Sequence, residues 1–154
     1  LGRATDPASR VKLAWGTDVG GGNRFSMLNV LDEAYKVGMV NNGALGDTPE
    51  AARNRVSPYR AFWSVTQGGA EGLCIEEMVG NFEPGKEADF VVLDWNVGPA
   101  AQPWHQSLSV GAKGPRSVEQ AANLLFGIMM VSDDRAVDET WVMGRRLYRK
   151  KARA

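Results

Sequence analysis

Asp18 is the residue best placed for chemistry, because this single acid lies between a hydrophobic run at residues 11–15 and three glycines at residues 20–22. A carboxylate at the end of a strand can bind a metal ion, transfer a proton, or do both, and parallel α/β barrels build their active sites at that edge. Aspartate also commonly caps the turn or helix that follows it. The spacing leaves both roles open, and capping is the more frequent one.

The glycine-rich run GTDVGGG at residues 16–22 has two interpretations of its own. Its backbone amides could form a nest for an anion in front of a helix N-terminus. It could instead be a tight turn in which glycine lets the backbone pass close to a neighbour. The run lacks the Gly-Lys-Ser/Thr ending of a phosphate-binding loop and the glycine spacing of a dinucleotide-binding loop, so it favours the tight turn.

Other side chains suited to catalysis or metal binding are few. A catalytic zinc site usually has three protein ligands, commonly histidines, and the sequence has one histidine, His105, in a loop flanked by prolines. We expect His105 to lie at or near the surface. The single cysteine, Cys74, lies among apolar residues, and we expect it to be a buried small side chain rather than a nucleophile. One histidine does not allow a Ser-His-Asp or Cys-His set to be assembled.

The elements that position Asp18 follow from the hydrophobic pattern. Residues 11–15 are predicted to form a short strand and residues 16–23 a loop. Apolar residues at three- and four-residue spacing, beginning at Phe25, then predict an amphipathic helix that ends near residue 41. Asn23 or Ser26 could cap the start of this helix.

The middle of the chain is predicted to be helical and its last half to form strands. Ser57-Pro58 is an N-cap followed by proline, so a helix should start there and break at Gly68-Gly69, with a short helix at residues 70–74. Residues 90–93 form an apolar run of strand length, and residues 96–115 read as a loop. A further helix is expected from Ser117 through residue 129, where Gln120 completes a capping box, and two closing strands should meet around Gly144. The change in pattern near Val79 is the best candidate for a domain boundary.

Composition and charge limit the classes of partner that the chain is expected to bind. Apolar residues make up 44% and charged residues 23% of the 154 residues, which is typical of a globular protein. The 18 acidic and 18 basic residues balance, so we expect neither nucleic acid nor a membrane surface as a partner, and the basic run at residues 144–154 is expected to be a solvated tail. No apolar stretch of membrane-spanning length and no secretory leader is visible. With one cysteine and no disulfide framework, the sequence fits a reducing compartment, and we expect a cytoplasmic protein.

Three motifs resemble one family. GTDVGGGNRFSMLNVLDEAYKV (residues 16–37) resembles the last barrel strand and following helix of guanine deaminases, which are members of the metal-dependent amidohydrolase superfamily. VGNFEPGKEADFVVLDW (residues 79–95) resembles the segment in which such enzymes re-enter their small β-sandwich domain, and SDDRAVDETWVMGRRL (residues 132–147) resembles their closing strands. The first motif is the specific one, whereas the later two are shared across the superfamily.

The resemblance implies that Asp18 is the aspartate ligand of a single catalytic zinc ion and a proton shuttle. It further implies guanine as substrate, hydrolysis to xanthine and ammonia, and a homodimer for the intact enzyme. Zinc lowers the pKa of bound water toward about 7, and a neighbouring carboxylate can accept the proton. The alternatives are another amidohydrolase acting on purines or triazines, including chlorohydrolases, and a non-catalytic folded module with a structural or interaction role.

The expected fold class is α/β: the C-terminal part of a TIM-like (β/α)8 barrel, with its last strand and helices, plus part of a small β-sandwich domain. Residues 1–78 would form the end of the barrel, residues 79–95 and 137–149 strands of the sandwich, and residues 96–136 the connecting loop and helix. A whole barrel needs about 250 residues, so the chain starting at Leu1 looks like a C-terminal portion of the enzyme. We expect it to be inactive alone, not to retain zinc, and to leave the strand at residues 11–15 without neighbours, so that this segment pairs with another chain, rearranges or is disordered.

Overall fold

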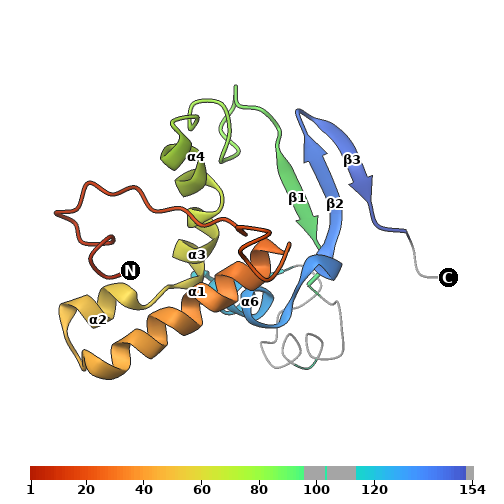
Figure 1. Cartoon of the computed structure of the whole chain (residues 1–154). Helices are drawn as coiled ribbons and strands as arrows, with labels where there is room; N and C mark the ends of the chain where they lie inside the picture. Colours follow the sequence, from red (N-terminus) through yellow and green to blue (C-terminus); the bar gives the residue numbers. More distant parts are fainter. Residues whose placement is uncertain (96–102, 104–113, 152–154) are drawn as a thin grey trace.

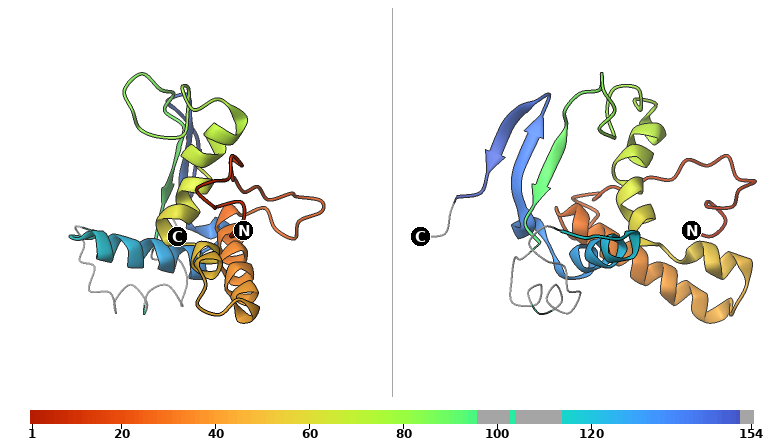
Figure 2. Two further views of the ribbon diagram at one scale, coloured as in Figure 1. Left: turned by 90° about the vertical axis from the view of Figure 1, so that its left-hand side faces the viewer. Right: turned by 180° about the vertical axis from the view of Figure 1, so that it is seen from behind.

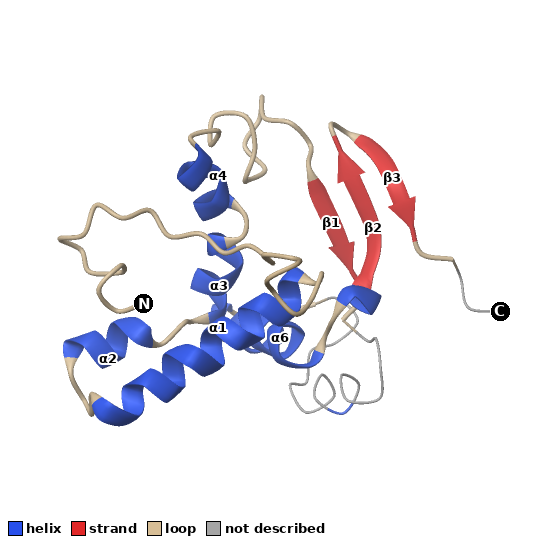
Figure 3. Cartoon of the chain, in the orientation of Figure 1, coloured by secondary structure: helices blue, strands red, loops and turns tan. Residues whose placement is uncertain are grey.

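The chain folds into a group of helices with a small antiparallel sheet beside them (Figure 1). A computed structural model describes residues 1–95, 103 and 114–151. Figure 3 shows the helices on one side of the molecule and the sheet on the other, and in Figure 2 α6 crosses α1. The helices are α1 (Met27–Asn41), α2 (Pro49–Asn54), α3 (Pro58–Ser64), α4 (Gln67–Leu73) and α6 (Val118–Val131), with 3₁₀ turns η1 (Asn42–Ala44) and η2 (Asp134–Ala136). The strands are β1 (Phe90–Leu93), β2 (Val137–Val142) and β3 (Arg145–Arg149), in the order β1-β2-β3.

This arrangement supports an α/β chain with a small antiparallel sheet, the coarser part of the expected fold class. The elements α1, α3, β1, α6, β2 and β3 all lie close to their predicted positions. The assignment of residues 1–78 to a barrel, of residues 79–95 and 137–149 to a β-sandwich, and of residues 96–136 to a connection stays a prediction. His105 and most of the loop predicted at residues 96–115 lie outside the described residues.

Helix starts follow the capping signals in the sequence. Ser57 and Ser117 each accept a hydrogen bond from the backbone amide three residues further on, at 3.2 and 3.1 Å, as their sequence context predicts. Thr48 does the same for Ala51 at 3.2 Å and begins α2, a helix that the hydrophobic pattern did not predict. Thr48-Pro49 carries the same cap-proline signal as Ser57-Pro58, so α2 could have been predicted.

The predicted break between two helices exists, but it lies at Val65 and Thr66 rather than at Gly68-Gly69, because α4 runs through both glycines. A Cβ atom at Gly68 would lie 2.6 Å from Cζ3 of Trp63, so glycine is needed there to let the indole ring pack against the helix. The prediction that Cys74 is buried is also wrong. Cys74 ends α4 in the left-handed conformation, with φ of 59°, and is exposed.

The strand predicted at residues 11–15 does not form in the described part of the chain, where this segment is extended without a neighbouring strand. A strand needs backbone partners along its edges, and none of the described strands reaches it. Its side chains hold it instead: Nζ of Lys12 donates to the carbonyl of Glu71 at 2.7 Å and lies 3.9 Å from the Glu76 carboxylate, while Trp15 packs against the core.

The core is built from two adjoining clusters under α1, α3 and α6. One contains Leu28 with Leu124 and Ile128, and the other contains Leu31 with Met129. Leu28 and Leu31 are three residues apart on the predicted apolar face of α1, so the helical spacing correctly predicted the buried face of this helix.

We expect Leu31→Ala to lower the free energy of unfolding by about 2–5 kcal/mol, because the leucine side chain is fully buried and its removal leaves a cavity. Val40→Ala on the same helix is the matched control. Its side chain is exposed, so the substitution should change stability by less than about 0.5 kcal/mol. Urea denaturation followed by circular dichroism measures both values, and equal losses for the two variants would contradict the assignment of this core.

The sheet ends in the predicted hairpin around Gly144. Met143 and Gly144 both have positive φ, at 49° and 70°, which is the geometry of a two-residue turn that matches the twist of its strands. The amide of Met143 donates to Oδ1 of Asp89 at 2.6 Å, which holds the non-glycine residue in this conformation.

On β2, Nε1 of Trp141 donates to the Glu139 carboxylate at 2.7 Å. This bond, together with the neighbouring guanidinium groups of Arg146 and Arg149, holds the pKa of Glu139 below its usual value.

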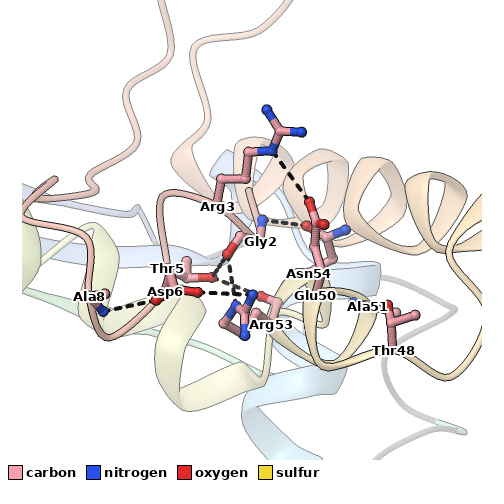
Figure 4. A network of polar contacts seen from close by, with 10 residues as sticks. All are labelled: Gly2, Arg3, Thr5, Asp6, Ala8, Thr48, Glu50, Ala51, Arg53 and Asn54. Atoms are coloured by element: carbon pink, nitrogen blue, oxygen red, sulfur yellow. Dashed lines mark hydrogen bonds and ion pairs between the residues drawn. The ribbon is translucent and has the colours of Figure 1, made fainter.

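The N-terminal residues are fastened to α2 by a polar network (Figure 4). The guanidinium of Arg53 donates to the carbonyl of Gly2 and pairs with Asp6, both at 3.0 Å. The hydroxyl of Thr5 donates to the carbonyl of Arg53 at 3.2 Å, and the amide of Gly2 donates to the side chain of Asn54, which is buried. A Cβ at Gly2 would meet Asn54 and Glu50 within 3 Å, so this contact needs glycine.

Among the described residues, no helix combines the length and the apolar character needed to cross a lipid bilayer.

Candidate functional site

Asp18 lies between the extended segment at residues 11–15 and α1. The segment before it is fixed to the C-terminal end of α4 by Lys12 and to the core by Trp15. The loop after it leads directly into α1, whose Leu28 and Leu31 are buried. The position of Asp18 is therefore set from both sides by elements that are themselves anchored.

The backbone of Asp18 forms a tight turn. Asp18 has φ of 46°, in the left-handed region that aspartate tolerates better than most residues. Its carbonyl accepts hydrogen bonds from the amides of Gly21, at 2.9 Å, and of Gly22. Because both amides point to this carbonyl, they are not available for an anion, and the structure supports the tight-turn interpretation of the glycine run.

Two of the three glycines in the turn, Gly20 and Gly22, are required by the backbone geometry, and Gly21 lies against the Asp18 side chain. Gly20 has φ of 115°, which other residues rarely adopt. A Cβ at Gly21 would lie 2.8 Å from Oδ2 of Asp18, and one at Gly22 would collide with the carbonyl oxygen of Thr17. The glycines thus let the chain fold back against Asp18 and leave room for its carboxylate.

The carboxylate of Asp18 does not act as a cap. The N-cap residue of α1 is Ser26, which has extended backbone angles and makes no side-chain capping bond. Within the described part of the chain, no hydrogen bond or ion pair is made by the Asp18 carboxylate, and the residue is exposed. Of the two roles that the spacing left open, capping is wrong. The carboxylate is oriented toward Gly21 and free to contact something outside the described residues.

Two residues tie the rest of the loop to its surroundings. Nδ2 of Asn23, considered above as a helix cap, instead donates to Oε1 of Glu33 on α1 at 2.9 Å. The next residue, Arg24, lies near Asp133, whose pKa is held below its usual value chiefly by the guanidinium of Arg135 and in small part by that of Arg24. Sequence spacing could not predict these two contacts. The first joins Asn23 to the polar face of α1, and the second joins Arg24 to a residue distant along the chain.

The residues around Asp18 do not make a complete metal site by themselves. Across the described ranges, no group of three or more His, Cys, Asp and Glu side chains is arranged to hold a metal ion. The free carboxylate of Asp18 fits the chemistry of one oxygen ligand. Any metal bound through Asp18 would take its other ligands from beyond the described residues, as the low number of histidines predicts.

Comparison with known proteins is consistent with this incomplete site. The profile of the Amidohydrolase family matches residues 7–147, which include Asp18, its glycine turn, β1, β2 and the first part of β3. The chain belongs to the Amidohydrolase family.

Several of its amidohydrolase relatives are guanine deaminases. The crystal structure of guanine deaminase from Bradyrhizobium japonicum is 67% identical and superposes with a TM-score of 0.89 over 98% of this chain and 34% of that protein. Guanine deaminase from Escherichia coli is 39% identical over 141 residues, which are 92% of this chain and 27% of that protein. Its solved structure superposes with a TM-score of 0.73 and covers 92% of this chain and 28% of that one.

The chain therefore spans between about a quarter and a third of the length of these amidohydrolases. Within that span its fold is theirs, since nearly the whole chain superposes on the Bradyrhizobium structure. The family resemblance found from three sequence motifs is confirmed. In this amidohydrolase segment Asp18 is exposed, has no partner for its carboxylate among the described residues, and follows a run anchored by Lys12.

Proposed function

We propose that this chain supplies the aspartate-bearing part of a guanine deaminase. The complete protein would hydrolyse guanine: water attacks the carbon that bears the amino group, the bond from that carbon to nitrogen breaks, and xanthine and ammonia leave. The observation that carries the proposal is the 67% identity to the Bradyrhizobium guanine deaminase over 98% of the chain, with a TM-score of 0.89. The unpaired carboxylate of Asp18 in the segment matched by the family supports it.

Asp18 would have two roles in that reaction. A zinc ion, when bound, would supply a Lewis acid that eases the deprotonation of water. The carboxylate of Asp18 would be one of the ligands. As general base and then general acid, it would accept the proton of the attacking water and pass it to the departing amine. Its freedom from capping and ion pairs suits both roles, because no described residue competes for its oxygens.

A chimera tests the function directly. In the guanine deaminase from Bradyrhizobium japonicum, the segment that this chain matches is replaced by residues 1–154, which is conservative at 67% identity. We expect the purified chimera to convert guanine to xanthine, followed by absorbance, and to contain about one zinc per chain by mass spectrometry. Turnover of adenine or a triazine in preference to guanine would refute the proposed substrate, and a folded chimera without any turnover would refute the proposed activity. Sedimentation of the same sample tests the predicted homodimer.

The chain alone should neither retain zinc nor release ammonia from guanine. Its described residues offer the Asp18 carboxylate but no group of three ligands arranged to hold a metal, whereas a catalytic zinc site usually needs three protein ligands. We expect residues 1–154, dialysed against buffer containing zinc and then desalted, to hold less than about 0.1 equivalent of zinc, because the other ligands are missing. Stoichiometric zinc at Asp18, lost in Asp18→Asn, would show that this prediction is wrong.

A further inference from the structure

An open apolar trough separates the helices from the sheet. It consists of two adjoining clefts of about 530 and 470 Å³ that share Val65, Phe90 and Val91 among their lining residues. The larger cleft is lined from the helical side by Phe25 and Phe62, and the smaller by Leu73 and residues of the following turn. Figure 1 shows the corresponding position, with β1 facing α3 and α4. We call these two clefts the trough.

Side chains of the trough are unusually exposed for their type. Phe25 and Phe82 each expose 83% of their surface, Leu73 exposes 73% and Val91 exposes 52%. All four line the trough and come from separate segments of the chain. Apolar side chains gathered at one concave surface, rather than scattered singly, mark a site that binds another apolar surface.

The described residues leave the trough open. The sheet packs against the helices at the C-terminal end of β1, and the trough lies along the rest of that strand. Leu93 and Trp95 pack against the cluster of Leu28 and Ile128, and the amide of Asp94 donates to the carbonyl of Ala136 at 2.8 Å. Toward the opposite end of β1, Phe90 stacks on Trp141 of the neighbouring strand, with ring centroids 5.4 Å apart. The walls of the trough are thus fixed, while its interior is open.

The Bradyrhizobium relative keeps the walls of the trough in nearly the same arrangement. The Bradyrhizobium structure superposes on 98% of this chain with a TM-score of 0.89, so the helices and the sheet keep nearly the same mutual arrangement there. The trough therefore does not close by movement of its own walls in a protein of which this chain covers 34%. The extended run at residues 11–15, which has no strand beside it among the described residues, likewise has backbone groups available to another segment.

We propose that the trough is a docking surface for amidohydrolase polypeptide that lies outside the segment matched by this chain. The occupant is an apolar segment of that polypeptide, which covers Phe25, Phe82 and Val91 in the assembled protein. The proposal rests on the proposed function only in its choice of a guanine deaminase as the source of the partner polypeptide. It concerns assembly rather than chemistry, so the two can fail separately.

Thiol labelling compares the trough in the free chain and in the chimera. Phe25→Cys and Phe82→Cys are each made in a Cys74→Ser background, because Cys74 is exposed. The two phenylalanines are solvent-exposed, so the substitutions should leave the fold intact, as circular dichroism checks. We expect both introduced thiols to react with a maleimide at least about tenfold more slowly in the chimera than in residues 1–154, as for a segment whose exposure requires local opening.

Val40→Cys is the matched control, because Val40 is 78% exposed and lies on α1 away from the trough. Its labelling rate should be the same in both proteins. Equal rates for Phe25→Cys in the two proteins would overturn the proposal, as would equal protection at Val40. Protection that develops in the free chain as its concentration rises would assign the trough to a second copy and also overturn it. Protection in a chimera that lacks deaminase activity would support the docking surface and count only against the proposed function.

Discussion

Asp18→Asn in the chimera is expected to lower kcat/KM for guanine by about 10³-fold or more. Asparagine keeps the size of the side chain but removes the charge that would bind a metal and the basicity that would accept a proton under the proposed function. Positioned acid–base groups contribute about 10²–10⁴-fold to rate, and the loss of a metal ligand adds to this. Because the Asp18 carboxylate makes no hydrogen bond or ion pair with the described residues, its substitution should leave stability nearly unchanged. Steady-state kinetics and thermal unfolding of the same sample separate the two effects.

Asp47→Asn is the matched control for this experiment. The Asp47 carboxylate is fully exposed and makes one ion pair, at 3.7 Å from Arg55, so its charge contributes little to stability. Activity should stay within about twofold of the parent, as for other surface substitutions. Zinc content distinguishes the roles of Asp18: loss of zinc in Asp18→Asn indicates a ligand, and loss of rate with zinc retained indicates a proton shuttle. Normal turnover with normal zinc would show that Asp18 has neither role.

Local signals in the sequence predicted most of the regular structure. The caps at Ser57 and Ser117, the periodicity of α1 and the glycine turn at the end of the hairpin are encoded within a few residues, so they could be recognised without knowing the fold. The strand predicted at residues 11–15 depends on partners distant in sequence, and the described chain does not provide them. Gly68 lies inside α4 against the ring of Trp63, and the local sequence does not reveal this packing.

The candidate site, like the fold, could be predicted from local sequence only in part. Its sequence position drew attention to Asp18, but spacing favoured a capping role that the structure excludes, because the turn is closed by the backbone carbonyl rather than by the carboxylate. Local sequence could not show this, since a capping aspartate and a ligand aspartate can have the same neighbours. Only the family resemblance favoured the ligand role. The anchoring contacts of Lys12 and Asn23 join residues that no short motif connects.

A substitution in the glycine turn at residues 20–22 is expected to have the second large effect on activity. We expect Gly22→Ala to lower kcat/KM of the chimera by about 10²-fold, because the added methyl group would collide with the carbonyl of Thr17 and approach that of Asp18, to which the Gly22 amide donates. The turn must open to admit it, and displacing a reacting group by about 1 Å can cost that much in rate. Zinc affinity should fall as well if Asp18 is a ligand.

Gly16→Ala is the control that isolates this effect. Gly16 lies in the same run, has no positive φ and would place its Cβ in open space, so alanine should be tolerated there with activity within about twofold. Both variants add one methyl group within the GTDVGGG segment, and they differ in whether the turn can accommodate it. Equal activity of the two variants would show that the turn does not position Asp18. A loss confined to Gly22→Ala, with thermal stability of the chimera preserved, would show that the glycines act through the placement of the carboxylate. Their contribution would then be to hold Asp18 in a left-handed backbone conformation with its oxygens unobstructed, rather than to contact a ligand themselves.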